Sequence, residues 1–212
     1  RLTLAEALAL VRRHPALFRE VYPARNVNNL YLDSMDLRDY YDHINGIANR
    51  TKTRVRWYGL WSGSIGLPML ERKLKHGNVS GKASLALPPF WMNGYLSKAE
   101  LEAAFDRANL EALARAALRH RQPSLLNRYR RHYFQSADGH FRLTVDSDLQ
   151  FAAAPHTAAS AVSFSPPADL IVIELKFGLA EADSAARITN ALPFRLSRCS
   201  KYVLGLNTIA AR

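Results

Sequence analysis

The chain has 212 residues, of which 48% are hydrophobic, so it can bury one sizeable core and is predicted to form a single domain over residues 1–212. Its 29 Lys and Arg outnumber its 18 Asp and Glu, and the net charge of +11 indicates an anionic partner such as nucleic acid, polyphosphate or anionic lipid. A single cysteine excludes an internal disulfide framework, and no run approaches the roughly 20 apolar residues that a membrane-spanning helix needs.

Capping signals and hydrophobic periodicity predict elements along the whole chain. Thr3 with Glu6 has the spacing of a capping box ahead of an apolar helical pattern. Ser97 with Glu100 repeats that spacing. In chain order, the predicted elements are a helix at about 4–13, strands at Val27–Asp33 and Thr53–Gly59, a loop at Ser62–Pro68, strands at Met69–His76 and Lys82–Leu87, helices at about 98–106 and 108–119, strands at Leu126–Gln135 and His140–Asp148, a loop at Ala152–Pro167, a strand at Leu170–Phe177 and a helix at about 183–192.

This order of elements favours an α+β protein. The strands mostly follow one another, and the helices are interposed in pairs, which favours antiparallel pairing over repeated βαβ units. Seven long strands that pair in this way are expected to close into an antiparallel β-barrel or a strongly curved sheet, with the helices packed outside.

The charged residues of the predicted strands gather on one face. Side chains two apart share a face, so Arg54 and Arg56 point away from Val55 and Trp57. The same alternation puts cations, with a few carboxylates, on one face of four further strands: Glu71, Lys73 and Lys75; Arg128 and Arg130; Arg142, Thr144 and Asp146; Glu174 and Lys176.

A solvated polar face explains any one of these strands, but it explains five of them poorly. Solvated faces usually mix neutral polar residues with both charge signs, whereas this face is mostly Arg and Lys. Like charges directly opposite one another destabilise a sheet. We therefore expect a multivalent anion on this face and a divalent metal on its few carboxylates.

The motifs of other anion-binding classes are missing from the sequence. It has no zinc-finger spacing, no RNP-type aromatic motif and no basic helix with base-reading residues, so nucleic acid is not the expected partner. It has no Walker-type glycine loop, and its seven histidines show no metal-ligand spacing. Arg binds phosphate oxygens in a bidentate way and Lys adds point charge, so a phosphate-rich ligand is favoured.

Seven segments, taken together and in order, carry a resemblance to a known family. They are Val27–Asp33, Asn49–Gly59, Leu70–Lys75, Asn127–Arg131 with Phe134 and Gln135, Arg142–Asp146, Ile173–Lys176 and Ser200–Tyr202. The chain resembles the VTC (vacuolar transporter chaperone) domain, a polyphosphate polymerase branch of the triphosphate tunnel metalloenzymes. The resemblance implies an eight-stranded tunnel in which inward Arg and Lys bind triphosphate or polyphosphate, and inward Glu holds Mn²⁺ or Mg²⁺.

The resemblance also implies roles for individual residues. The residues implied in catalysis are Arg54, Arg56, Lys73, Arg130, Arg142 and Lys201. Those implied in substrate binding are Lys75, Arg128, Lys176, Arg198 and Ser200, and those implied in metal binding are Glu174 and Glu71. Simpler roles stay open for several: Arg128 or the neighbouring Arg131 can pair with surface acids, Lys75 can be solvated, and Ser200 can cap a short helix.

The implied reaction transfers the terminal phosphoryl group of ATP to a growing polyphosphate chain. Two alternatives stay open, a tripolyphosphate hydrolase of the same superfamily and a module that binds polyphosphate without turnover. The expected partners are ATP and polyphosphate, or else tripolyphosphate or pyrophosphate. Family members normally begin with a strand that carries a Glu-x-Lys motif, whereas this sequence opens directly with the helix at Leu2. The family's first strand, with its phosphate-binding Lys and candidate metal-binding Glu, is therefore expected to be lacking.

The expected location is the cytoplasm, because the single Cys199 fits a reducing compartment. In related systems this domain sits beside membrane components, which implies a membrane-protein partner although this sequence has no membrane segment of its own.

Overall fold

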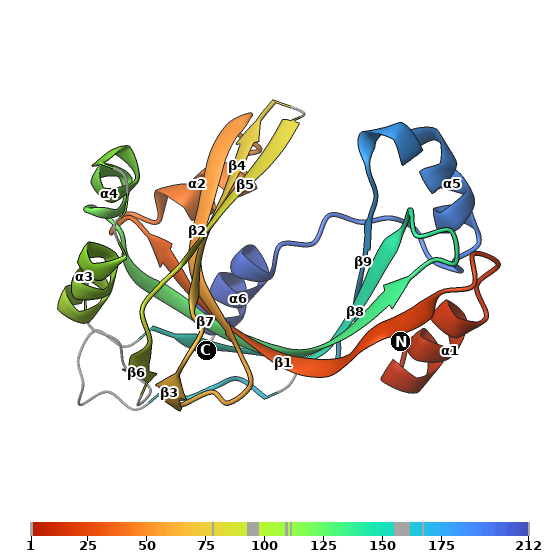
Figure 1. The fold of residues 1–212 in the computed structure, drawn as a ribbon, viewed down its shortest axis with the longest axis horizontal. Coiled ribbons are helices and arrows are strands. Elements are labelled where there is room, and N and C mark those ends of the chain that lie inside the picture. Colours follow the sequence, from red (N-terminus) through yellow and green to blue (C-terminus); the bar gives the residue numbers. More distant parts are fainter. Residues whose placement is uncertain are drawn as a thin grey trace. The chain divides into compact units, whose positions relative to one another are not determined.

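The computed structural model describes residues 2–77, 79–92, 98–108, 110, 112–154, 162–166 and 168–211. The elements of this part (Figure 1) are α1 (Leu4–Arg12), β1 (Arg19–Asp33), α2 (Arg38–Ile44), β2 (Asn49–Tyr58), β3 (Gly63–Ile65), β4 (Met69–His76), β5 (Val79–Ala86), β6 (Phe90–Met92), α3 (Lys98–Arg107), α4 (Ala112–Leu118), β7 (Gln122–Gln135), β8 (Arg142–Ala153), β9 (Val172–Lys176), a 3₁₀ turn (Leu179–Glu181), α5 (Ala182–Asn190) and α6 (Lys201–Ala210).

The chain divides into two compact units. Unit 1 comprises Arg1–Asn26, Tyr129–Leu149 and Pro167–Cys199, and unit 2 comprises Val27–Arg128, Gln150–Pro166 and Ser200–Arg212. A seven-stranded sheet has the order β5-β4-β2-β1-β7-β8-β9, and β3 pairs with β6 in a separate two-stranded sheet. Three strands, β1, β7 and β8, contribute residues to both units. The single domain predicted from composition stays a prediction.

The α+β class is confirmed, and the pairs β1–β2, β2–β4, β4–β5 and β8–β9 are antiparallel as predicted. The closed barrel is not confirmed, because β5 and β9 stand at the two ends of the described strand order. None of the described helices is long and apolar enough to cross a membrane.

Local signals explain how unit 1 begins. Thr3 caps α1, since its hydroxyl accepts the amide of Glu6 at 3.3 Å and the Glu6 carboxylate accepts the amide of Thr3 at 2.8 Å. The buried side of α1 packs Ala7 and Val11 into a core cluster. The other buried members of that cluster are Phe18, Phe134, Phe141, Leu143, Val145, Ala185 and Ile188. The predicted capping box and helix are therefore confirmed.

In unit 2, one face of the sheet is apolar. Leu30, Val55 and Leu70 lie in register across β1, β2 and β4, and each is at most 4% exposed. Leu101 and Phe105 of α3 belong to the same core cluster, so this helix covers the apolar face. Because strand side chains alternate, the residues between these apolar positions point to the opposite face.

Several elements differ from the sequence prediction. The loop predicted at Ser62–Pro68 is wrong in its middle, where Gly63–Ile65 forms β3 and pairs with β6. The helix α2 was not predicted, and α6 was foreseen only as the short helix that Ser200 can cap. The helix α4 is shorter than the predicted helix at 108–119. The capping box of Ser97, and the loop over residues 155–161, lie outside the described residues.

The helix α2 was missed because the side chains that cap it belong to residues before its N-cap position. The carboxylate of Asp33, at the end of β1, accepts the amides of Asp39 at 2.9 Å and Tyr40 at 3.1 Å in the first turn. The residue at the N-cap position, Leu37, makes no side-chain cap and has a φ of 54°. The hydroxyl of Ser34 accepts the amide of Arg38, the first residue of the helix, at 3.0 Å. Because the N-cap position itself holds no Ser, Thr, Asp or Asn, the usual start signal is missing from the sequence.

Candidate functional site

Four neighbouring strands of unit 2 bring their polar side chains to the face opposite the apolar core. The register places Arg54 opposite both Tyr31 and Glu71, and it places Arg56 opposite Asn29. We call this surface the basic face. Its members are Asn29, Tyr31, Arg50, Lys52, Arg54, Arg56, Glu71, Lys73, Lys75 and Lys82.

Glu71 lies at the centre of the basic face and is surrounded by cations. Its Oε2 accepts Nε of Arg54 at 2.8 Å, and its Oε1 lies 2.6 Å from Nζ of Lys82. A guanidinium nitrogen of Arg56 is 3.7 Å from Oε2. Burial raises the pKa of Glu71, but the charges of Arg54 and Arg56 outweigh it and lower the pKa to about 2. One carboxylate that is ionised at physiological pH therefore faces three cations.

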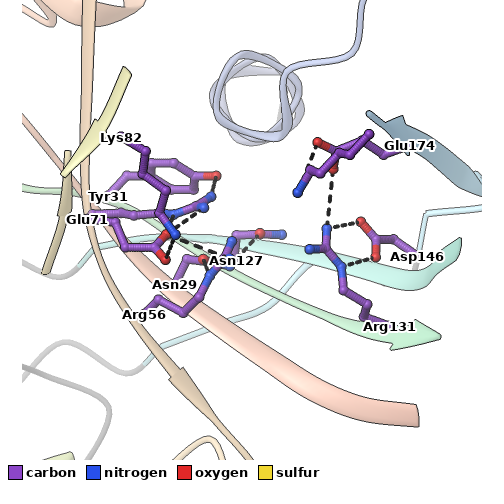
Figure 2. Close-up of polar contacts among 11 residues, drawn as sticks. Asn29, Tyr31, Arg56, Glu71, Lys82, Asn127, Arg131, Asp146 and Glu174 are labelled. Atoms are coloured by element: carbon purple, nitrogen blue, oxygen red, sulfur yellow. Dashed lines mark hydrogen bonds and ion pairs between the residues drawn. The ribbon is translucent and has the colours of Figure 1, made fainter. Parts of the chain in front are cut away.

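A chain of amides holds Arg56 in place (Figure 2). Nε of Arg56 donates to Oδ1 of Asn29 at 2.9 Å, and Nδ2 of Asn29 donates to Oδ1 of Asn127 at 3.2 Å. Asn127 in turn donates to the backbone oxygen of Gln150 at 3.1 Å. Because Arg56 is only 8% exposed, its guanidinium is fixed in orientation before any ligand arrives.

Farther along the strands, cations stand directly opposite one another. Lys52 of β2 lies opposite Lys73 of β4, and Lys73 lies opposite Lys82 of β5. In the next row, Arg50 lies opposite Lys75. Cross-strand pairs of like charge are destabilising. This end of the basic face is therefore suited to a multivalent anion.

The pKa of His43 in α2 reports the same surplus of positive charge. Burial lowers this pKa first, and neighbouring cations lower it further, to about 4. Those cations, in order of effect, are Lys52, Arg50, Lys75 and Lys73. The imidazole is consequently neutral at physiological pH, and its Nε2 lies 3.4 Å from Nζ of Lys52.

The helix α6 begins beside the basic face. Ser200 is its N-cap, and the hydroxyl accepts the amide of Val203 at 3.4 Å and Nζ of Lys52 at 2.7 Å. The capping role that the sequence left open for Ser200 is therefore confirmed. Tyr202, one residue after Lys201, stacks on Tyr31 with ring centroids 4.8 Å apart.

Further contacts fix α6 in unit 2. The hydroxyl of Tyr202 donates to Asp33 at 2.5 Å. A Cβ added to Gly205 would lie 2.5 Å from side-chain atoms of both Leu125 and Phe151. The helix therefore packs against β7 and β8 as closely as a glycine allows.

Unit 1 contains a second charged cluster, with a different balance (Figure 2). The guanidinium of Arg131 donates to both oxygens of Asp146, at 2.6 and 2.7 Å, and Asp146 is fully buried. Glu174 lies 3.7 Å from Arg131 and 3.4 Å from Nζ of Lys176. Burial lowers the pKa of Arg131, but the hydrogen bonds to Asp146 outweigh it and raise the pKa above its usual value. Two carboxylates and two cations balance here.

The other predicted site residues lie outside these clusters. Arg130 is exposed, whereas its neighbour Arg131 reaches the acidic residues. Arg128 donates to the side chain of Gln150 at 2.6 Å. Arg142 is exposed and lies opposite Lys176 across β8 and β9, and Arg198 is exposed in the segment before α6. The roles predicted for these residues stay predictions.

The oxygen atoms near Glu174 fit a hard divalent cation. Thr144 lies opposite Glu174 in the strand register, and its buried hydroxyl has no hydrogen-bond partner in the described structure. Mg²⁺ and Mn²⁺ prefer oxygen ligands and often combine one or two protein groups with substrate phosphates. No group of three His, Cys, Asp or Glu side chains suited to a metal occurs among the described residues. The oxygens of Glu71 lie 2.6 and 2.7 Å from Lys82 and Arg54, whereas those of Glu174 lie 3.4 and 3.7 Å from Lys176 and Arg131. The more exposed Glu174, held less closely by cations, therefore fits a metal better.

The sequence interpretation missed some residues of these clusters. Lys52 lies two residues before Arg54 and therefore shares the face of Arg54 and Arg56. The predicted strand began one residue later, at Thr53, and did not include it. Lys82 lay in a predicted strand without a charged neighbour two residues away. Asn29 and Asn127 lie in segments that carry the family resemblance, but nothing in the sequence shows that two amides 98 positions apart meet.

Comparison with known proteins gives one family. The family model described as "VTC domain" matches residues 4–210, nearly the whole chain, and confirms the resemblance carried by the short segments. No curated protein matches the chain.

Proposed function

Because the chain belongs to the VTC domain family, we propose that it is a polyphosphate polymerase, which transfers the terminal phosphoryl group of ATP to a growing polyphosphate chain. Membership in the family is consistent with a polyphosphate-related function and suggests a polyphosphate-metabolising enzyme. The observation that carries the proposal is the surplus of cations on the basic face. There, the carboxylate of Glu71 faces three cations, Arg54, Arg56 and Lys82.

Phosphoryl transfer needs alignment and charge neutralisation more than covalent chemistry from the protein. Arg54 and Arg56 offer guanidinium groups that can bind phosphate oxygens in pairs. Glu71 and Asn29 hold these groups in fixed orientations, so little reorganisation is needed when the anion binds. Lys73 supplies a further exposed cation on the next strand.

The proposed cofactor is Mn²⁺ or Mg²⁺. Glu174 would hold the ion together with the hydroxyl of Thr144. Thr144 lies opposite Glu174 in the strand register, and its hydroxyl has no hydrogen-bond partner in the described part of the chain. When bound, such an ion neutralises charge on phosphate oxygens. Two hydrogen bonds link Arg131 of β7 to Asp146 of β8, and Arg131 lies 3.7 Å from Glu174.

The test is to incubate the purified chain with ATP and either Mn²⁺ or Mg²⁺, and to measure ADP and polyphosphate. We expect the parent chain to form both products and Arg54→Ala to lose them. The matched control is Arg119→Ala, which removes an exposed arginine after α4 and should leave the rate unchanged. The same products in Arg54→Ala at the parental rate would overturn the role of the basic face.

Two other outcomes would replace the polymerase with a different activity. Inorganic phosphate without polyphosphate would show a hydrolase, because the basic face then orients water rather than a phosphate acceptor. No turnover, together with a melting temperature that tripolyphosphate raises, would show a binding module.

A further inference from the structure

Lys52 occupies a defined place between two other side chains of unit 2. Its Nζ donates to the hydroxyl of Ser200 at 2.7 Å and lies 3.4 Å from Nε2 of His43. These partners come from the start of α6 and from α2. A lysine ammonium is normally a mobile point charge on a flexible stem. Here it is held from two sides.

The chemistry of the groups fixes the tautomer of His43. An ammonium group only donates hydrogen bonds, so Nε2 must accept and the neutral ring must carry its hydrogen on Nδ1. Nδ1 is buried and has no hydrogen-bond partner in the described part of the chain. No other polar contact of the imidazole is therefore seen to compete with its contact to Lys52.

The position of Lys52 is costly without such a partner. Lys73 stands directly opposite it across β2 and β4, and Arg50 and Lys75 form the next pair. Repulsion from these cations would turn a flexible lysine away from the face. The neutral imidazole accepts a hydrogen bond without adding another positive charge.

We propose that His43 is a positioning residue that holds Lys52 against Ser200, so that the ammonium and the start of α6 meet a polyphosphate chain in a fixed arrangement. This inference rests on the proposed polyphosphate binding by the basic face. His43 does not contact the anion and acts through Lys52. Holding the lysine in advance reduces the conformational entropy that is lost when the anion binds.

The test is a double-mutant cycle with His43→Leu and Lys52→Met, in which the affinity for inorganic tripolyphosphate is measured by calorimetry. We expect Lys52→Met to weaken binding about tenfold, the loss of one charge-assisted contact. His43→Leu should weaken it about threefold in the parent and not at all in the Lys52→Met background. His43→Gln, whose amide oxygen can accept from Lys52, should recover most of the affinity.

The control is His120→Leu, which removes an exposed histidine after α4 and should not change the affinity. An equal effect of His43→Leu in both backgrounds would overturn the inference, and so would no effect in the parent. Melting temperatures without ligand separate loss of folding from loss of positioning.

A ligand-independent measurement separates this inference from the proposed function. Nitrogen-15 NMR of the His43 ring should show a neutral imidazole with the hydrogen on Nδ1, and the signal of Nε2 should shift in Lys52→Met. Hydrogen on Nε2 would overturn the positioning role even if polyphosphate binds. If the ring has the expected form but tripolyphosphate does not bind, the contact exists, and both the proposed function and the positioning of Lys52 for polyphosphate fall.

Discussion

The two charged clusters use similar residues in opposite balance. In unit 2, Glu71 faces Arg54, Arg56 and Lys82, so positive charge is left over. In unit 1, Arg131 and Lys176 are matched by Asp146 and Glu174, so the charges cancel. The cationic residues of the two clusters look alike in the sequence. Among the contacts described above, however, cations outnumber carboxylates in the first cluster and equal them in the second.

Because the charge balance differs, mutations should have different effects in the two clusters. The cluster of unit 1 is built on a fully buried carboxylate whose charge depends on one arginine. The cluster of unit 2 already carries mutual repulsion among its cations, which a bound anion would relieve. Loss of a charge should therefore affect mainly folding in unit 1 and mainly binding in unit 2.

The largest effect is expected for Arg131→Met. This change leaves Asp146, which is 0% exposed, without its two hydrogen bonds. Removing one partner of a buried ion pair typically costs about 3–5 kcal/mol. Urea denaturation should show a loss of that size. The control is Asp106→Asn, which breaks an exposed ion pair with Arg115 and should cost less than about 1 kcal/mol. Equal losses of stability in both variants would contradict a structural role for the buried pair of unit 1.

A smaller effect on folding, with an opposite effect on binding, is expected for Glu71→Gln. Its carboxylate is 8% exposed and holds three cations, so its removal should cost about 1–3 kcal/mol in the free energy of unfolding. Tripolyphosphate should then raise the melting temperature more than it does in the parent, because the anion replaces the missing negative charge. If Glu71 held the metal instead, the variant would lose metal-dependent binding.

The pH dependence of stability follows from the lowered pKa of Glu71. Burial opposes this shift, and the charges of Arg54 and Arg56 produce it, so the pKa falls from 4.5 to about 2. Between these values the unfolded chain binds the proton that the folded chain does not. The stabilisation is present above pH 4.5 and is lost as the pH falls toward 2. Acid titrations of unfolding should show this loss in the parent and not in Glu71→Gln.

The smallest effect on stability is expected for Glu174→Gln. The Glu174 side chain is 41% exposed, so its ion pairs should contribute less than about 1 kcal/mol. If it holds the divalent ion, the metal concentration needed for half-maximal polyphosphate formation should rise about tenfold or more. Glu102→Gln, in an exposed pair with Lys98, serves as the control. An unchanged metal requirement would remove Glu174 from the proposed site.

The sequence alone determined which side chains share a face within a strand. The alternation of Arg54 and Arg56 with Val55 and Trp57 was predicted and is present, because the period of a strand is fixed by backbone geometry. The capping box of Thr3 was predicted for a similar reason, since all its partners lie within one turn. The family segments were also recognisable from sequence.

The tertiary structure alone decided which of these side chains meet. Register between strands places Glu71 opposite Arg54, where it also meets Lys82. The packing of β7 and β8 brings Arg131, and not Arg130, to Asp146. Register is set by the packing of whole faces and not by the residues of one strand. The placement of α2 is likewise decided by tertiary packing. It brings the first turn of the helix to Asp33 and His43 to Lys52, and neither contact could be predicted from the sequence.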